Sequence, residues 1–205
     1  MSGTSVRVLL ADDENLVRSA VAGLLDLQED IEVVAQAASG PEAVATARKA
    51  LPDVAVLDLQ MPGADGLAVA AQLHEQVPGC RTMVLTSHGR PGYLKRALEL
   101  GVRGFLPKTA SGAVLADAIR TVAAGGRWVD PELAADAIAA GESPLTPREA
   151  DVLELAADGA QVEEIALKVS LSPGTVRNHL SSAVGKLGVA NRHEAVAAAR
   201  RAGWI

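Results

Sequence analysis

The stretch VRVLLADDE, residues 6–14, runs from a mostly apolar segment directly into three acidic residues. An apolar run of this length is typical of a strand that is covered on both faces of a parallel sheet. Four similar runs follow in the first 125 residues, and a segment with apolar residues at helical spacing follows each of the five. Five such βα units predict an α/β fold with a doubly wound, five-stranded parallel sheet.

The predicted elements alternate regularly along the chain. The strands are Val6–Ala11, Ile31–Ala37, Val54–Leu59, Thr82–Ser87 and Gly104–Leu106. The helices are Glu14–Leu27, Gly40–Ala50, Gly66–Gln76, Gly92–Leu100 and Ser111–Ala124. Asp65 stands directly before the third helix, where an aspartate is a favoured N-cap.

Polar side chains follow the predicted strands at the edge where such sheets bind ligands. Asp12 and Asp13 follow the first strand, Asp58 lies in the third, Thr86 in the fourth, and Lys108 follows the fifth. Two like charges about 4 Å apart repel by roughly 4 kcal/mol at an effective dielectric near 20, so the three carboxylates need a cation. Oxygen ligands without sulfur or imidazole favour Mg²⁺ or Mn²⁺.

This set of residues resembles the receiver domain of bacterial two-component response regulators over about residues 5–124, which implies a flavodoxin-like fold. The resemblance implies that a sensor histidine kinase phosphorylates the chain in the presence of Mg²⁺. The implied roles are phosphoacceptor for Asp58, metal ligands for Asp12, Asp13 and Asp58, phosphate partners for Thr86 and Lys108, and switch aromatic for Phe105. Many receivers have Pro directly after the lysine, whereas here Pro107 precedes Lys108. Whether a peptide bond in this region is cis therefore stays open.

The second part of the chain changes character after Gly125-Gly126. Residues 125–142 are predicted to be a linker with room for one short helix in Leu133–Ala140, and no strand is predicted after Leu145. Thr146 and Glu149 have the spacing of a capping box. The predicted helices are Thr146–Ala157, Gln161–Val169, Ser172–Leu187 and Arg192–Ala202. The second and third, joined by a tight turn and a Ser-Pro start, predict a helix-turn-helix in an all-α domain over residues 143–205.

Four motifs in this domain resemble the LuxR-type DNA-binding domain. They are LTPRE (145–149), EIA (164–166), LSPGTVRNHL (171–180) and KLGV (186–189). A receiver domain (residues 1–124) followed by this domain resembles the NarL/FixJ family of transcription regulators. The implied contacts to double-stranded DNA are Thr175, Arg177, Asn178, Ser181 and Lys186. Relatives often have lysine at the position of Ser181, and Gln161-Val162 replaces the common Ser-Asn, so affinity or sequence preference is expected to differ.

The family resemblance also implies a mechanism. Phosphorylation of Asp58 would favour a homodimer, which would read two half-sites about one helical turn apart. The resemblance also allows RNA polymerase as a further binding partner. Pairing through the first and fifth helices and pairing through the fourth and fifth both stay open as the dimer contact.

The charge distribution fits this division of the chain. Residues 1–142 carry 12 Lys and Arg against 18 Asp and Glu, whereas residues 143–205 carry seven of each, so the net charge of −6 belongs to the first part. The segment Ser172–Leu187 contains no acidic residue, so its surface is expected to be locally positive. The net acidity of the whole chain therefore does not argue against DNA as a partner.

Other classes of function fit the sequence less well. A haloacid-dehalogenase-type phosphatase needs a second aspartate two residues after the nucleophile, where Gln60 stands, and no G-x-G-x-x-G motif follows the first strand. We therefore do not expect an enzyme, whereas a regulator whose receiver only dimerises stays open. The single cysteine, Cys80, and the absence of a long apolar run favour a reducing, cytoplasmic location without a membrane span.

Overall fold

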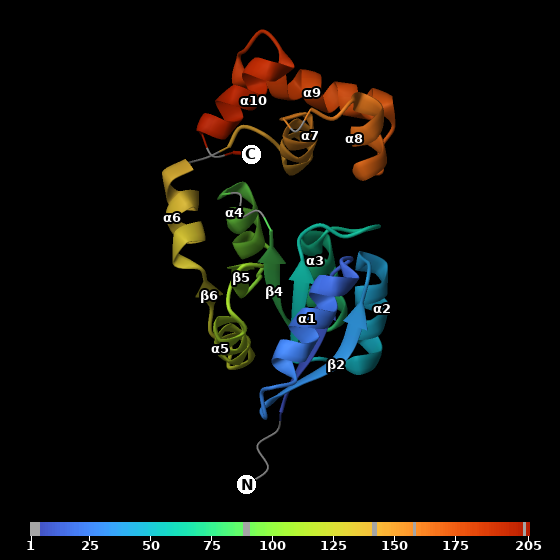
Figure 1. The fold of residues 1–205 in the computed structure, drawn as a ribbon, viewed down its shortest axis with the longest axis vertical. Coiled ribbons are helices and arrows are strands. Elements are labelled where there is room, and N and C mark those ends of the chain that lie inside the picture. The colour runs from blue at the N-terminus through green and yellow to red at the C-terminus, as the bar shows by residue number, and fades with distance from the viewer. Residues whose placement is uncertain (1–4, 88–90, 141–142, 158, 203) are drawn as a thin grey trace. The chain divides into compact units, whose positions relative to one another are not determined.

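The computed structural model describes residues 5–87, 91–140, 143–157, 159–202 and 204–205. The chain divides into two compact units, and the main division falls in sequence between Leu133 and Ala134, with residues 91–93 grouped with the second unit. The first unit contains a parallel sheet flanked by helices, and the second is helical (Figure 1). Each unit has a hydrophobic core of its own.

The sheet of the first unit has six parallel strands in the order β2-β1-β3-β4-β5-β6. The strands are β1 (Val6–Ala11), β2 (Ile31–Ala37), β3 (Val54–Asp58), β4 (Arg81–Thr86), β5 (Gly104–Pro107) and β6 (Trp128–Val129). The five predicted strands are confirmed, but the prediction of a five-stranded sheet was wrong by one edge strand. The backbone N–H groups of Trp128 and Asp130 donate to the carbonyls of Arg103 and Phe105, which pairs β6 with β5. A strand of two residues has no periodicity that a sequence could reveal.

Helices cover both faces of this sheet. They are α1 (Asn15–Leu25), α2 (Gly40–Ala50), α3 (Gly66–Gln76), α4 (Pro91–Glu99) and α5 (Gly112–Ala123), and α6 (Pro131–Ala140) follows β6. Alternate strand residues such as Val8, Val56 and Leu106 form one buried cluster with side chains of α1 and α5. The intervening residues, such as Leu9 and Leu57, are equally buried. Because both sets of strand side chains are buried, the runs are continuously apolar, as expected.

The loop after β3 is fixed by Asp65 and Gly66. The Asp65 carboxylate accepts a hydrogen bond from the backbone N–H of Ala68 at 2.7 Å, so its predicted role as the N-cap of α3 is confirmed. A Cβ atom at Gly66 would lie 2.2 Å from the carbonyl oxygen of Asp58. Only glycine therefore allows α3 to begin this close to the end of β3.

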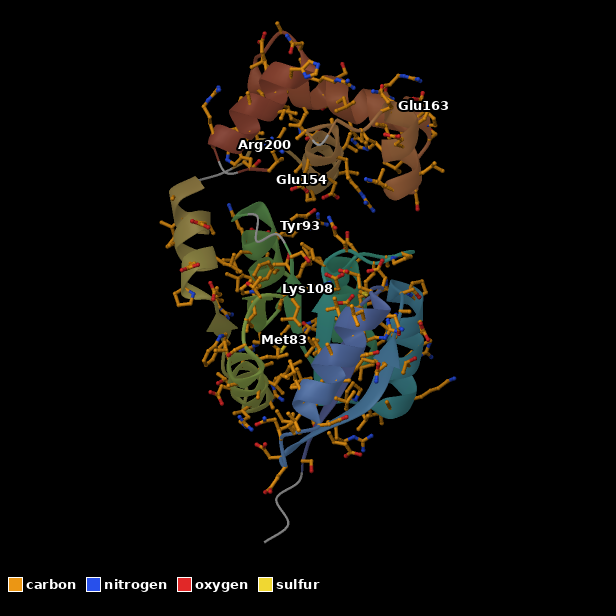
Figure 2. All side chains as sticks on the ribbon, viewed as in Figure 1. Met83, Tyr93, Lys108, Glu154, Glu163 and Arg200 are labelled. Carbon is orange, nitrogen blue, oxygen red and sulfur yellow. The ribbon has the colours of Figure 1, made fainter. Side chains whose placement is uncertain are left out.

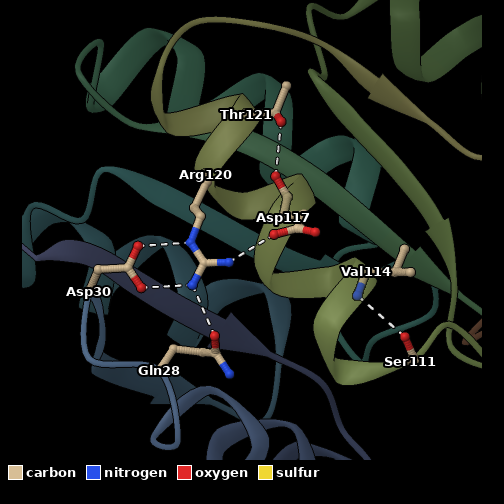
Figure 3. Close-up of polar contacts among 7 residues, drawn as sticks. All are labelled: Gln28, Asp30, Ser111, Val114, Asp117, Arg120 and Thr121. Carbon is tan, nitrogen blue, oxygen red and sulfur yellow. Dashed lines mark hydrogen bonds and ion pairs between the residues drawn. The ribbon is translucent and has the colours of Figure 1, made fainter.

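An arginine on α5 ties that helix to the turn between α1 and β2 (Figure 3). The Arg120 guanidinium donates two hydrogen bonds of 2.7 Å to the carboxylate of Asp30 and one of 2.9 Å to Gln28. It also pairs with Asp117 one turn earlier in α5 at 2.8 Å. The hydrogen bond with Arg120 lowers the pKa of Asp30. This bidentate pair fixes the position of α5 on the α1 side of the sheet.

The second unit is built from α7 (Pro147–Ala157), α8 (Val162–Lys168), α9 (Pro173–Leu187) and α10 (Arg192–Arg201). Ser172 caps α9 by accepting from the backbone N–H of Thr175 at 3.1 Å. Gly188 ends the helix with a φ of 64°, which is the left-handed conformation common at helix C-termini. Val176, Leu180 and Ala183 face a core that includes Leu153 and Ile165. The predicted all-α unit with a Ser-Pro start of its third helix is confirmed.

Every helix in the described part of the chain is too short or too polar to cross a lipid bilayer.

Candidate functional site

Three aspartates meet at the carboxyl end of the sheet. Asp12 follows β1 and Asp58 ends β3, the strand next to it, so both carboxylates lie at the same edge. One oxygen of each, together with one of Asp13, lie within 4.8 Å of one another. Asp12 and Asp58 are buried, whereas Asp13 is exposed. A set of only carboxylate oxygens, open to solvent on one side, suits a hard divalent cation such as Mg²⁺.

Lys108 lies at the centre of this acidic group, and Figure 2 shows it at the end of the sheet. Its ammonium is 2.8 Å from an Asp12 oxygen, 3.0 Å from an Asp58 oxygen and 3.2 Å from a Glu14 oxygen. Burial alone would lower the pKa of Lys108, but hydrogen bonds with Asp12 and Asp58 outweigh burial and raise it above its usual range. The lysine is therefore held in its charged form at neutral pH.

Asp58 has a strongly perturbed carboxyl group. Burial raises its pKa to about 6, and the neighbouring charge of Asp12 acts in the same direction. Lys108 and the backbone N–H of Gln60 oppose this effect. The environment therefore disfavours the charged form of the Asp58 carboxyl group. A bound cation or a change of charge at this carboxyl would reduce that free-energy cost.

Thr86 lies on β4, the strand beside that of Asp58, and Phe105 lies on β5, the next strand along. Thr86 ends β4 opposite Pro107, and Phe105 in β5 is paired with Val84. Both side chains are buried, and the backbone carbonyl of Thr86 accepts a hydrogen bond from Lys108 N–H at 2.8 Å. The described residues contain no cis peptide bond, so the Leu106-Pro107-Lys108 region is trans throughout. The switch role of Phe105 stays a prediction.

Glu14 is a residue of this pocket to which the sequence analysis assigned no role. Its carboxylate shares the Lys108 ammonium with two aspartates, although its side chain is mostly exposed. The only signal in the sequence was its place directly after Asp12-Asp13. That position is compatible with many loop conformations, so it does not predict a contact with a residue 94 positions away.

The exposed face of α9 carries most of the residues that were predicted to contact DNA. Arg177, Asn178 and Ser181 are exposed, and they lie opposite the buried Val176 and Leu180. Thr175 is half-buried, and its hydroxyl lies 2.8 Å from the Ser172 hydroxyl that caps the helix. The structure therefore gathers three of the five predicted residues on one accessible surface.

Lys186 has a different environment from these residues. Its ammonium lies 2.8 Å from a carboxylate oxygen of Glu149, which is buried at the start of α7. Glu149 also accepts hydrogen bonds from the Ser182 hydroxyl at 2.6 Å and from the Thr146 N–H at 2.6 Å. Burial raises the pKa of Glu149, but these partners outweigh it and lower the pKa to about 2. The predicted capping box is confirmed, and its glutamate also anchors α9.

Arg177 also has an acidic partner in another helix. Its guanidinium lies 3.1 Å from a carboxylate oxygen of Glu163 in α8, and both side chains are largely exposed. The expectation of a locally positive α9 therefore needs a correction. The helix itself has no acidic residue, but Glu149 and Glu163 of neighbouring helices pair with Lys186 and Arg177.

Comparisons with known proteins identify both units. The family model of the response regulator receiver domain matches residues 8–120, and that of the bacterial regulatory proteins of the luxR family matches residues 143–199. The transcriptional regulatory protein DesR of Bacillus subtilis (strain 168) is 42% identical over 200 residues, which are 98% of this chain and 99% of DesR.

Two solved structures extend this likeness to the fold. The crystal structure of response regulator ChrA, from a heme-sensing two-component system, is 34% identical with a TM-score of 0.58 and covers 99% of this chain and 100% of its own. The response regulator RcsB in complex with DNA is 28% identical with a TM-score of 0.63, over 96% of this chain and 98% of RcsB. Because both family models match in order along one chain that aligns with DesR almost from end to end, the chain belongs to the response regulators of the NarL/FixJ family.

Proposed function

We propose that this response regulator is switched by phosphorylation of Asp58 by a sensor histidine kinase, and that the switch controls dimerisation, promoter binding and transcription. The observation that carries the proposal is the position of the Asp58 carboxylate. It is buried, and one of its oxygens lies 3.0 Å from the Lys108 ammonium. One Asp58 oxygen also lies within 4.8 Å of an oxygen of Asp12 and of one of Asp13. Family relatives such as DesR are named transcriptional regulatory proteins.

The phosphoryl transfer can be assigned to atoms of this pocket. An Asp58 carboxylate oxygen attacks the phosphorus of a phosphohistidine, the N–P bond breaks, and the electron pair of that bond stays with the imidazole. Asp12, Asp13 and Asp58 would hold Mg²⁺, which when bound neutralises negative charge on the transferring phosphoryl group. Lys108 and Thr86 then bind phosphate oxygens of the new acyl phosphate.

The switch follows from the shared lysine. In the unphosphorylated pocket Lys108 is divided among Asp12, Asp58 and Glu14. The acyl phosphate carries about −1.5 to −2 charges at pH 7 in place of the single charge of the Asp58 carboxylate, so it competes with Asp12 and Glu14 for the ammonium. Movement of Lys108 and Thr86 would then be transmitted to Phe105. Its side chain is buried in β5, the strand that precedes Lys108 and pairs with the strand of Thr86. Phosphate shifts the equilibrium only to the extent that it binds one arrangement better.

The output side of the proposal concerns double-stranded DNA. We propose residues 1–124 as the receiver domain, 125–142 as a linker whose strand β6 extends the receiver sheet, and 143–205 as the DNA-binding domain. Thr175, Arg177, Asn178, Ser181 and Lys186 would contact DNA as parts of a phosphorylation-dependent homodimer. The exposed face of α9 and the RcsB–DNA complex support this. Contact with RNA polymerase and a cytoplasmic location would follow from this role at a promoter.

The test compares the full chain with Asp58→Asn and with the matched control Asp65→Asn. Each is incubated with Mg²⁺ and a small phosphodonor such as acetyl phosphate, and intact mass, oligomeric state and DNA affinity are measured. We expect wild type and Asp65→Asn to gain one phosphoryl group, to dimerise, and to bind promoter DNA about tenfold or more tightly, in the range typical of allosteric coupling. Asp58→Asn should show none of these changes.

Two outcomes would contradict the proposal. A phosphoryl group on Asp58→Asn would place the acceptor elsewhere. Equal dimerisation and DNA affinity with and without phosphate would favour a regulator whose receiver only dimerises. Arg177→Ala should weaken DNA binding while the variant stays folded and is still phosphorylated, and unchanged affinity would move the DNA-binding surface away from α9.

A further inference from the structure

The structure pairs Arg177, a predicted DNA contact, with a glutamate of the preceding helix. Arg177 Nη2 in α9 lies 3.1 Å from Glu163 Oε1 in α8. Glu163 is labelled in Figure 2 at the α8 end of the helical unit. About two thirds of each side chain is exposed, so the pair lies on the surface. An exposed ion pair of this kind contributes little to the stability of the fold.

The first turn of α8 contains two adjacent glutamates with different contacts. Glu164 accepts a hydrogen bond from the backbone N–H of Gln161 at 2.9 Å and so completes the cap of α8. Glu163 instead reaches across to α9 and Arg177. The capping role therefore accounts for Glu164, whereas Glu163 contributes to α8 only as an acidic residue of its first turn.

The position of Glu163 matters once α9 lies in a major groove. In a helix-turn-helix the second helix enters the groove and the first crosses the sugar-phosphate backbone. A carboxylate in the first turn of α8 then faces phosphates of the same sign. A phosphate that binds Arg177 there competes with Glu163 for its guanidinium.

We propose that Glu163 is a positioning residue that competes with DNA phosphates for Arg177 and thereby suppresses sequence-independent DNA binding by the unphosphorylated chain. This inference rests on the proposed DNA-binding function and adds a residue to it. Phosphate contacts supply essentially all of non-specific binding, so withdrawing one arginine weakens that mode directly. A regulator whose dimerisation controls promoter binding needs this low background, because a monomer that binds any DNA tightly leaves little for dimerisation to add.

Charge in the rest of the unit is consistent with this role. Residues 143–205 carry seven cationic and seven acidic side chains, so no large excess of positive charge offsets the loss of Arg177. Lys186, the lysine of α9, is paired with the buried Glu149. The exposed carboxylate of Glu163 can therefore reduce the electrostatic attraction between this unit and DNA by a large fraction.

The test uses the full unphosphorylated chain and a short labelled duplex of arbitrary sequence. Affinity is measured by fluorescence anisotropy at several salt concentrations for wild type, Glu163→Gln, Arg177→Ala and the double variant. We expect Glu163→Gln to bind about five- to tenfold more tightly at low salt and to increase the steepness of the log–log salt dependence by about 1. In the Arg177→Ala background the same substitution should change affinity less than twofold, because its effect passes through Arg177.

Glu164→Gln is the matched control. It removes the same charge from the neighbouring position, and glutamine can still accept the capping hydrogen bond. We expect it to change affinity less than twofold. Equal gains for Glu163→Gln and Glu164→Gln, or an equal gain with and without Arg177, would overturn the inference in favour of a general charge effect. If no form of the chain binds duplex at low salt, even after treatment with Mg²⁺ and acetyl phosphate, the DNA-binding function itself fails. Binding that Glu163→Gln leaves unchanged overturns only the role of Glu163.

Discussion

The two units of this chain distribute their charges in opposite ways. In the receiver unit one lysine, Lys108, is shared by Asp12, Asp58 and Glu14 at a single end of the sheet. In the helical unit Lys186 and Arg177 each face one carboxylate that belongs to another helix. An excess of carboxylates at one point suits a bound cation such as Mg²⁺. One-to-one pairing instead balances the charges of Lys186 and Arg177 with carboxylates of neighbouring helices.

The pairs of the helical unit also differ from each other in burial. Glu149 is almost completely buried, whereas Glu163 is mostly exposed. Removing the partner of a buried charge is far more costly than removing the partner of an exposed one. The two pairs therefore allow structural and electrostatic roles to be separated within one small domain.

The largest effect that we expect is the loss of the Lys186 ammonium. Lys186→Met keeps the aliphatic stem but leaves the buried Glu149 carboxylate without its cation, which should lower the free energy of unfolding of the helical unit by about 2 to 4 kcal/mol. Each unit contains one tryptophan, Trp128 in β6 and Trp204 near the C-terminus. Urea unfolding in a Trp128→Phe background, followed by Trp204 fluorescence, measures the helical unit alone.

Two controls accompany this variant. Lys168→Met removes an exposed lysine from α8 and should change the free energy of unfolding by less than about 0.5 kcal/mol. Glu149→Gln combined with Lys186→Met should recover part of the lost stability, because the buried group is then neutral. A loss below about 1 kcal/mol for Lys186→Met would mean that water replaces the lysine at Glu149, and the proposed difference between the two pairs would disappear.

Acid should affect the helical unit through the same glutamate. The pKa of Glu149 is about 2 in the folded chain against an ordinary value of 4.5, so the folded state stabilises the carboxylate. Its contribution, about 3 kcal/mol, is fully present above pH 4.5 and is lost as the pH falls from 4.5 toward 2. Unfolding curves of the Trp128→Phe protein at a series of pH values measure this loss.

Glu149→Gln provides the reference for the pH series. Its stability should be lower than that of the unsubstituted protein at pH 7 but should depend less on pH between 4.5 and 2. If both proteins lose the same stability over this range, other carboxyl groups account for the acid sensitivity of the unit.

The fold was largely accessible from the sequence because burial on both faces of the sheet leaves a continuous apolar run for each long strand. Val54–Asp58 is buried at every position, and the sequence reveals it as an apolar segment with an aspartate at its end. The strand Trp128–Val129 was not accessible, because two residues beside a Gly-Gly pair show no period. Its pairing depends on backbone carbonyls at the free edge of β5, which the sequence does not display.

The candidate sites divide along a similar line. The meeting of Asp12, Asp58 and Lys108 follows from topology alone, since parallel strands bring their carboxyl ends to one edge. The contacts of Glu14 with Lys108 and of Glu149 with Lys186 join residues 94 and 37 positions apart. Such contacts depend on side-chain reach between packed elements, for which spacing in the sequence gives no rule. The capping motif identified Glu149 as a local partner of Thr146 but not as the anchor of α9.

The smallest effect that we expect comes from removing the charge of Asp58, one of the clustered carboxylates of the receiver unit. This substitution tests whether the acidic excess at this end of the sheet is unfavourable for folding. Because burial and Asp12 raise the pKa of Asp58 to about 6, its carboxylate opposes folding at neutral pH. Asp58→Asn should therefore stabilise the receiver unit by about 2 kcal/mol in EDTA, as followed by Trp128 fluorescence in a Trp204→Phe background. Excess Mg²⁺ should stabilise the protein that retains Asp58, shrinking or reversing the difference, while leaving the helical unit unchanged. If Asp58→Asn instead destabilises the receiver unit, Lys108 already compensates its carboxylates completely, and the two units would not differ in how they balance charge.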